Sequence, residues 1–168
     1  MGLESKILSR EIQQFLYDNG STLGTAESCT GGRIAEAIIA VPGSSNYFKG
    51  GIISYTDEIK EKVLHVSKQT LKEKTAVSEE VAIEMVKGAC DVLNVDYAIA
   101  ATGVAGPGGG TPQTPVGTIW LAYGSKDDIR TSCQTEDEGR DVNLLKATNR
   151  VLKLFLEYLK EQNSQQEE

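Results

Sequence analysis

Histidine and cysteine are scarce in this sequence. Its 168 residues include one histidine, His65, and three cysteines, Cys29, Cys90 and Cys133, with no closely spaced pair among them. An odd number of widely spaced cysteines argues against a disulfide framework or a zinc site and favours a reducing compartment. A single histidine also excludes metal centres built from several histidines. We therefore expect a cytoplasmic protein.

Long apolar runs and an excess of positive charge are also missing. No run is long enough for a membrane span, and residues 1–6 lack the pattern of a signal peptide. The formal net charge of −7 argues against broad binding to nucleic acid or to acidic membranes, so we expect neither as a partner. An anionic small substrate would need a local group of Lys, Arg and backbone donors.

The remaining composition is that of an ordinary globular protein. Hydrophobic residues make up 39% of the chain and charged residues 24%. Apolar residues at helical spacing alternate with short β-favouring runs, which predicts an α/β fold, a three-layer α/β/α sandwich with a mixed β-sheet. We expect one such domain over residues 1–162 and a polar tail over residues 163–168.

The elements are expected to alternate along the chain. The strand over 50–56 is short and flat, which favours a central position, and the last two strands are expected to form an antiparallel hairpin. Helices are predicted over 3–18 and 31–40, after a cap at Asp57, in part of 68–74, after a cap at Ser78 and over about 141–160; strands are predicted up to Glu27 and over 50–56, 96–102, 116–123 and 129–134.

The turn within residues 22–33 gathers several reactive side chains. A strand runs into Glu27, Ser28 and Thr30 crowd the turn, and two glycines open a helix. Hydroxyls and unpaired backbone N–H groups would thus lie at a helix N-terminus, where an anion or a developing oxyanion is favoured. The simpler interpretation is that Ser28 or Thr30 only caps the helix, which contributes about 1 kcal/mol.

Three loops are expected to meet at one edge of the sheet. Residues 27–32, 55–60 and 102–110 each follow a strand, and ligands of open α/β sheets bind beyond the carboxyl ends of strands. The glycine-rich loop over 102–110 matches neither the P-loop nor the dinucleotide-binding fingerprint. By itself it is typical of a flexible surface turn, although missing Cβ atoms would let it approach a ligand closely.

Ser28 needs a base to act as a nucleophile. Lys60 follows a strand within reach of the Ser28 turn, but lysine is a base only when its pKa is lowered, and spacing alone fits a solvated helix lysine. His65 lies in a lysine-rich helical segment, which favours an exposed or packing role. Cys29 is an alternative nucleophile, although a small buried cysteine is more often part of the core.

Several ordered motifs carry a resemblance to a known family. They are Thr-Ala-Glu-Ser-Cys-Thr-Gly-Gly at 25–32, Pro-Gly-Ser-Ser at 42–45, Gly-Ile-Ile-Ser-Tyr-Thr at 51–56 followed by Glu58 and Lys60, Ala-Val-Ser at 76–78, Thr-Gly-Val-Ala-Gly-Pro at 102–107 and Pro-Val-Gly-Thr at 115–118. From about residue 7 to 159 the chain closely resembles the CinA C-terminal domain family, whose characterised members are nicotinamide-nucleotide amidohydrolases. We expect its stand-alone form.

This resemblance implies an activity and a set of site residues. The implied reaction is hydrolysis of nicotinamide mononucleotide to nicotinate mononucleotide and ammonia, with no metal or other cofactor. Ser28 would be the nucleophile, Lys60 its general base, and Tyr55 an orienting or proton-relay residue. A homo-oligomer, most simply a dimer, is also implied. The implied substrate-binding residues are Thr30, Gly31, Gly32, Ser44, Ser45, Thr102, Gly103, Gly106 and Arg140.

One region departs from the family pattern. Active relatives commonly show Gly-Asp-Arg and then Val-Arg before the last helix, whereas this chain has Glu-Gly-Arg at 138–140 and Asn-Leu at 143–144. The acidic residues at 136–138 would place negative charge near the substrate's phosphate. Two alternatives to the amidohydrolase remain. This region favours a catalytically weak nucleotide-binding or regulatory module of the same fold. The other alternative is a thiol hydrolase that uses Cys29 and His65.

Overall fold

A computed structural model describes residues 2–166 of the chain. Its centre is a five-stranded sheet with the order β2-β1-β3-β4-β5. The three strands on one side, β2, β1 and β3, run parallel, whereas β4 and β5 pair antiparallel to their neighbours as a hairpin. The strands are β1 (Leu23–Glu27), β2 (Phe48–Ile53), β3 (Tyr97–Gly103), β4 (Ile119–Ser125) and β5 (Asp128–Gln134).

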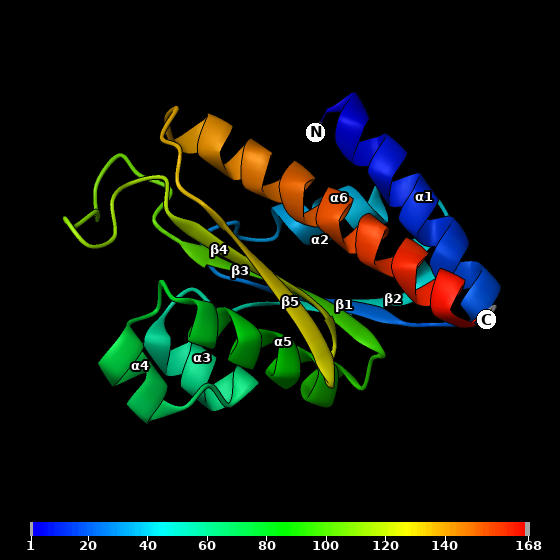
Figure 1. Cartoon of the computed structure of the whole chain (residues 1–168), viewed down its shortest axis with the longest axis horizontal. Coiled ribbons are helices and arrows are strands. Elements are labelled where there is room, and N and C mark those ends of the chain that lie inside the picture. Colours follow the sequence, from blue (N-terminus) through cyan, green and yellow to red (C-terminus); the bar gives the residue numbers. More distant parts are fainter. Residues whose placement is uncertain (1, 167–168) are drawn as a thin grey trace.

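Helices cover both faces of this sheet (Figure 1). One layer contains α1 (Leu3–Asn19), α2 (Arg33–Ile39) and α6 (Arg140–Gln166), and the other contains α3 (Asp57–Leu64), α4 (Lys68–Lys74) and α5 (Glu79–Leu93). The predicted three-layer α/β/α sandwich with a mixed sheet is therefore confirmed. Within residues 2–166, no helix is both long and apolar enough to cross a bilayer.

Each helical layer buries one apolar cluster against the sheet. Ile12 and Leu16 of α1 meet Val151 and Phe155 of α6 on one face. On the other face, Met85 and its neighbours in α5 pack on the small residues of β1, β3 and β4. Those strand residues are largely alanines, which lets the helices approach the sheet closely. The three inner strands, β1, β3 and β4, are thus largely buried on both sides.

Several predicted boundaries are corrected by the structure. The strand predicted to be central, β2, is an edge strand, because β1 lies between it and the other strands. Thr56 rather than Asp57 is the N-cap of α3, since its hydroxyl accepts the N–H of Ile59. The last helix, expected to end near residue 160, continues to Gln166, so residues 163–166 of the predicted tail are helical. Residues 167 and 168 lie outside the described part.

Strand order determines where the site lies. The chain leaves β1 for β2 on one side and then returns to β3 on the other side of β1. The loops after β1 and β3 therefore diverge, and a crevice opens between the carboxyl ends of these strands. Such switch points are the usual ligand sites of open α/β sheets.

Candidate active site

A cleft of about 290 Å³ opens at this switch point. Three parts of the chain contribute reactive side chains to it: Ser28 from the turn after β1, Tyr55 and Lys60 from the segment after β2, and Arg140 from the first turn of α6. The glycine-rich loop that follows β3 forms another wall. Residues distant in the sequence thus converge as the strand ends predict.

Ser28 and Lys60 form a buried pair in this cleft. The Nζ atom of Lys60 lies 3.0 Å from Ser28 Oγ and donates a second hydrogen bond of 2.9 Å to the Ser54 carbonyl. Lys60 is only 1% exposed, and no ion pair of Lys60 is present among residues 2–166. Burial lowers the pKa of Lys60, and the negative charge of Asp57 opposes that effect in part. A neutral amine can accept the proton of the serine hydroxyl.

Backbone donors lie directly after Ser28. The Ser28 N–H donates to Ala101 O, and the Gly31 N–H donates to Ser28 O. The N–H groups of Cys29 and Thr30, by contrast, have no oxygen acceptor within the described residues. Backbone amides next to a nucleophile are the usual donors for an oxyanion that forms on it.

The N-terminus of α2 is capped by a side chain of the protein itself, that of Glu27. The buried carboxylate of Glu27 accepts the N–H groups of Ile34 and Ala35, at 2.9 and 3.0 Å. The remaining first-turn donors bond to the carbonyls of Thr30 and Gly32. Ser28 does not cap this helix either, because the cap position is Gly32. The hydroxyl of Ser28 is therefore directed to Lys60.

Comparison with known proteins identifies the family. The model of the CinA C-terminal domain matches residues 5–159, nearly the whole chain. The chain belongs to the CinA C-terminal domain family. A CinA-like protein from Leptospira borgpetersenii serovar Hardjo-bovis (strain L550) is 53% identical over 118 residues, which are 70% of this chain and 28% of that protein. One from Shewanella piezotolerans is 48% identical over 124 residues, 74% of this chain and 29% of the relative. The chain thus matches less than a third of the length of these curated relatives.

Solved structures of the CinA superfamily share the fold at nearly full length. A competence-damaged protein (CinA) superfamily protein from Klebsiella pneumoniae superposes with a TM-score of 0.89 at 33% identity, covering 94% of this chain and 98% of that chain. One from Escherichia coli gives a TM-score of 0.87 at 37% identity, covering 90% and 88%.

The cleft brings together most, but not all, of the site residues implied by the CinA resemblance. Thr30 is fully buried and its hydroxyl has no partner within residues 2–166, and Gly31 and Gly32 lie outside the cleft wall. Ser44 and Ser45 precede β2, at the opposite end of the sheet from the cleft. The residues that do line the cleft are Ser28, Tyr55, Lys60, Thr102, Gly103, Gly106 and Arg140.

Tyr55 and Thr102 both line the cleft but differ in their contacts. Tyr55 is 60% exposed and its phenol makes no hydrogen bond within the described chain, whereas the Ser54 carbonyl holds the Lys60 amine. Thr102 donates its hydroxyl to Ala76 O at 2.8 Å, so it fixes the segment before α5. Asp57 also lines the cleft. Its place at the start of a helix predicts only a capping role, so the sequence does not indicate it as a site residue.

The cysteine alternative lacks its chemical partner. Burial raises the pKa of Cys29 to about 12, so its thiol stays protonated at neutral pH. His65 is exposed at the C-terminus of α3 and is not part of the cleft wall. Residues 2–166 also contain no group of three or more His, Cys, Asp or Glu side chains arranged to hold a metal ion.

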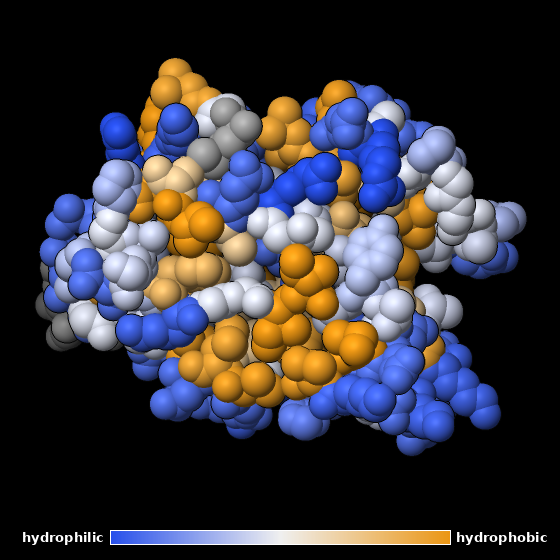
Figure 2. Space-filling model, turned by 180° about the vertical axis from the view of Figure 1, so that it is seen from behind, coloured by the Kyte–Doolittle hydropathy of each residue, from blue (hydrophilic) through white to orange (hydrophobic). Residues whose placement is uncertain are grey.

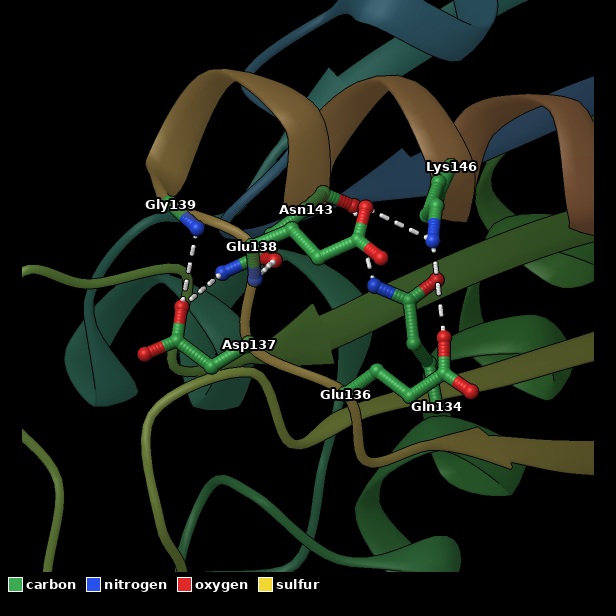
Figure 3. A network of polar contacts seen from close by, with 7 residues as sticks. All are labelled: Gln134, Glu136, Asp137, Glu138, Gly139, Asn143 and Lys146. Carbon is green, nitrogen blue, oxygen red and sulfur yellow. Dashed lines mark hydrogen bonds and ion pairs between the residues drawn. The ribbon is translucent and has the colours of Figure 1, made fainter.

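The acidic segment at 136–138 is held by partners close to it in the fold (Figure 3). Lys146 pairs with Glu136 at 3.4 Å and with Glu138 at 2.8 Å. The Asp137 carboxylate accepts the Gly139 N–H and an amide hydrogen of Asn143. None of the three acidic residues lines the cleft. These carboxylates therefore lie outside the cleft wall, and Lys146 pairs with two of them.

Proposed function

We propose that this CinA-family domain hydrolyses the carboxamide of nicotinamide mononucleotide to give nicotinate mononucleotide and ammonia. The observation that carries the proposal is the 3.0 Å contact between a buried lysine amine and Ser28 Oγ in an open cleft. The lowered pKa of Lys60 supports its role as a base. The three cysteines are free, which agrees with a cytoplasmic enzyme.

The proposed reaction has two halves. Ser28 Oγ attacks the carboxamide carbon while its proton passes to Lys60. The backbone N–H groups of Cys29 and Thr30 stabilise the resulting oxyanion, a contribution of about 3 kcal/mol per donor. The C–N bond then breaks, and Lys60 returns the proton to the departing nitrogen, which leaves as ammonia. Water, deprotonated by Lys60, attacks the acyl-enzyme and releases the carboxylate and Ser28.

The phosphate is proposed to bind at the other end of the cleft. Among the described residues, Arg140 and Lys60 are the two cationic side chains of the cleft wall, and Lys60 contacts Ser28. One N–H of Arg140 donates to Gly106 O, which holds the guanidinium beside the glycine-rich loop. Its other donors suit a phosphate, which arginine recognises through several N–H groups at once.

The decisive experiment measures ammonia and nicotinate mononucleotide from purified protein and nicotinamide mononucleotide. We expect wild-type turnover, and Ser28→Ala and Lys60→Ala should each lose roughly 10²-fold or more. Lys62→Ala is the matched control, because Lys62 is an exposed lysine on the same helix, paired with Glu58. Nucleotide binding without ammonia release by the folded protein would contradict the proposal and support a nucleotide-binding module.

We also propose that the chain forms a homodimer through the open edge of β2. The Ser54 N–H donates to Glu27 O of β1. Main-chain groups along a strand point alternately to its two sides, so those of Gly51 and Ile53 face away from β1. Ile53 and Ile39 are each 56% exposed beside this edge. Figure 2 looks onto this side of the molecule and shows apolar side chains gathered across it. Unpaired edges and apolar patches are typical of protein interfaces.

Charge supports a second copy as the occupant of this edge. Lys49 is exposed near the start of β2, and Asp57 is exposed just after its end. An antiparallel pair of β2 strands would place each Lys49 near the partner's acidic end. Light scattering should therefore give a dimer for the wild type and a monomer for Ile53→Lys. Ile7→Lys, an exposed apolar site on α1, is the control. A wild-type monomer at all concentrations would contradict the proposal.

A further inference from the structure

Asn143 connects three separate parts of the chain with one fully buried side chain (Figure 3). Its Nδ2 donates to Ala105 O of the glycine-rich loop at 3.1 Å and to Asp137 Oδ1 at 2.9 Å. Its Oδ1 accepts the N–H of Glu138 at 2.8 Å. The main-chain carbonyl of Asn143 also accepts a hydrogen bond from Gln134. Both amide hydrogens and the amide oxygen are therefore used.

The partners leave only one orientation for this amide. Glu138 contributes an N–H, which can only donate, so it must face the amide oxygen. Ala105 contributes a carbonyl and Asp137 a carboxylate, which both accept, so they must face the nitrogen. Bonding to Asn143 and to the Gly139 N–H keeps the pKa of Asp137 below its usual range, so this carboxylate stays ionised at neutral pH.

A second contact on the same helix continues this attachment. Arg140 lies one turn before Asn143 on α6 and donates to Gly106 O at 2.9 Å. The two side chains thus hold consecutive carbonyls, those of Ala105 and Gly106, and both of these residues line the cleft. Because Asn143 fixes the Ala105 carbonyl, it also fixes the position of the adjacent Gly106 carbonyl, which accepts the hydrogen bond from the Arg140 guanidinium.

We propose that Asn143 is a positioning residue that fixes the glycine-rich loop and Arg140 relative to Ser28, and so sets the affinity for the substrate's anionic end. Asn143 itself does not line the cleft and acts through Ala105 and Arg140. The same network holds the acidic segment at 136–138 against α6, away from the substrate. The inference rests on the proposed amidohydrolase function for its substrate, but not for the attachment of the loop.

The sharpest test is Asn143→Asp, which keeps the shape of the side chain. Its second oxygen would face two acceptors, Ala105 O and the Asp137 carboxylate, so the attachment should be lost. Asn149→Asp is the matched control, because Asn149 lies on the same helix and its amide also donates to a carboxylate, that of Glu4, outside the cleft. Asp137→Ala removes the exposed partner of Asn143 and serves as a second variant should Asn143→Asp fail to fold.

Two readouts separate positioning from general stability. In Asn143→Asp we expect the KM for nicotinamide mononucleotide to rise about tenfold or more with kcat changed much less, because misplacing a binding group weakens binding first. The KM for nicotinamide riboside, which lacks the phosphate, should change little. Hydrogen exchange of the amides at 104–110 should become faster in Asn143→Asp and Asp137→Ala but not in Asn149→Asp.

The outcomes that would overturn the inference are equally specific. Unchanged exchange at 104–110 in a folded Asn143→Asp protein would exclude the attachment. Equal KM increases for both substrates, or the same increase in Asn149→Asp, would reduce Asn143 to a structural role. If the wild-type protein does not hydrolyse nicotinamide mononucleotide, the proposed function fails by itself, and hydrogen exchange still decides whether Asn143 holds the loop.

Discussion

Lys60 Nζ contacts Ser28 Oγ at 3.0 Å, although 32 residues separate the two in sequence. The contact joins the turn after β1 to a helix that follows β2, and it depends on the two parallel strands ending at the same edge of the sheet. The amine is buried, and no carboxylate of residues 2–166 pairs with it. Such a lysine destabilises the folded state while gaining the lowered pKa that a base requires.

Lys60→Met is expected to stabilise the protein while abolishing its activity. The pKa of the Lys60 amine is lower in the folded protein than in the unfolded chain, so the unfolded chain binds the proton of this amine more tightly. The lysine therefore destabilises the fold most below its lowered pKa, and this penalty shrinks as pH rises toward the ordinary lysine value. Thermal melts at pH 7 should show a higher midpoint for Lys60→Met than for wild type, with a smaller gap near pH 10. A lower midpoint at pH 7 would be incompatible with a strained, buried amine.

The pH dependence of the reaction should follow the same group. Activity requires neutral Lys60, so kcat/KM should rise with pH through the lowered pKa of Lys60. The charge of Asp57 raises that pKa, so Asp57→Asn should move the acid limb of the profile to lower pH. Glu58→Gln, the exposed neighbour in the same helical turn, should leave it in place. An acid limb that stays fixed in Asp57→Asn would show that another group titrates.

The architecture could be predicted from the sequence because helices and strands each produce a local periodicity of apolar residues. The stripe of α1 and the small, apolar run of β3 predicted their elements nearly to the residue. The position of β2 was missed, since a short strand containing Gly50 and Gly51 fits an edge as well as a centre. The end of α6 was missed because the polar residues after Lys160 carry no helix-stopping Gly or Pro.

The candidate site was only partly visible in the sequence, for a related reason. Lys60 stands among charged residues, so its spacing indicated a solvated lysine, and only the meeting of three strand ends buries it. Glu27 appeared as the end of a strand, although it caps the next helix from within the core. Asn143 carried no signal beyond a departure from the family pattern, because its partners come from segments that the fold brings together.

Cys29→Ala is expected to retain activity within about threefold, while Ser28→Ala loses it. The pKa of the Cys29 thiol is raised to about 12, so thiolate is scarce at neutral pH. Alanine keeps the backbone N–H that is proposed to bind the oxyanion. Ammonia release by the two variants, side by side, checks this. Loss of activity in Cys29→Ala with full activity in Ser28→Ala would instead support a thiol hydrolase.

Glu27→Gln should destabilise the protein through the helix that follows Ser28. The two carboxylate oxygens of Glu27 accept the N–H groups of Ile34 and Ala35, and one also accepts the Thr25 hydroxyl. A glutamine would turn an NH₂ group toward one of these buried donors, which costs about 1–3 kcal/mol. Chemical denaturation measures this change, and activity should fall too, because α2 holds the turn that carries Ser28. Glu36→Gln, an exposed glutamate in the same helical turn, should cost less than about 1 kcal/mol. Equal losses in the two variants would mean that the helix dipole, rather than the buried acceptors of Glu27, accounts for the effect.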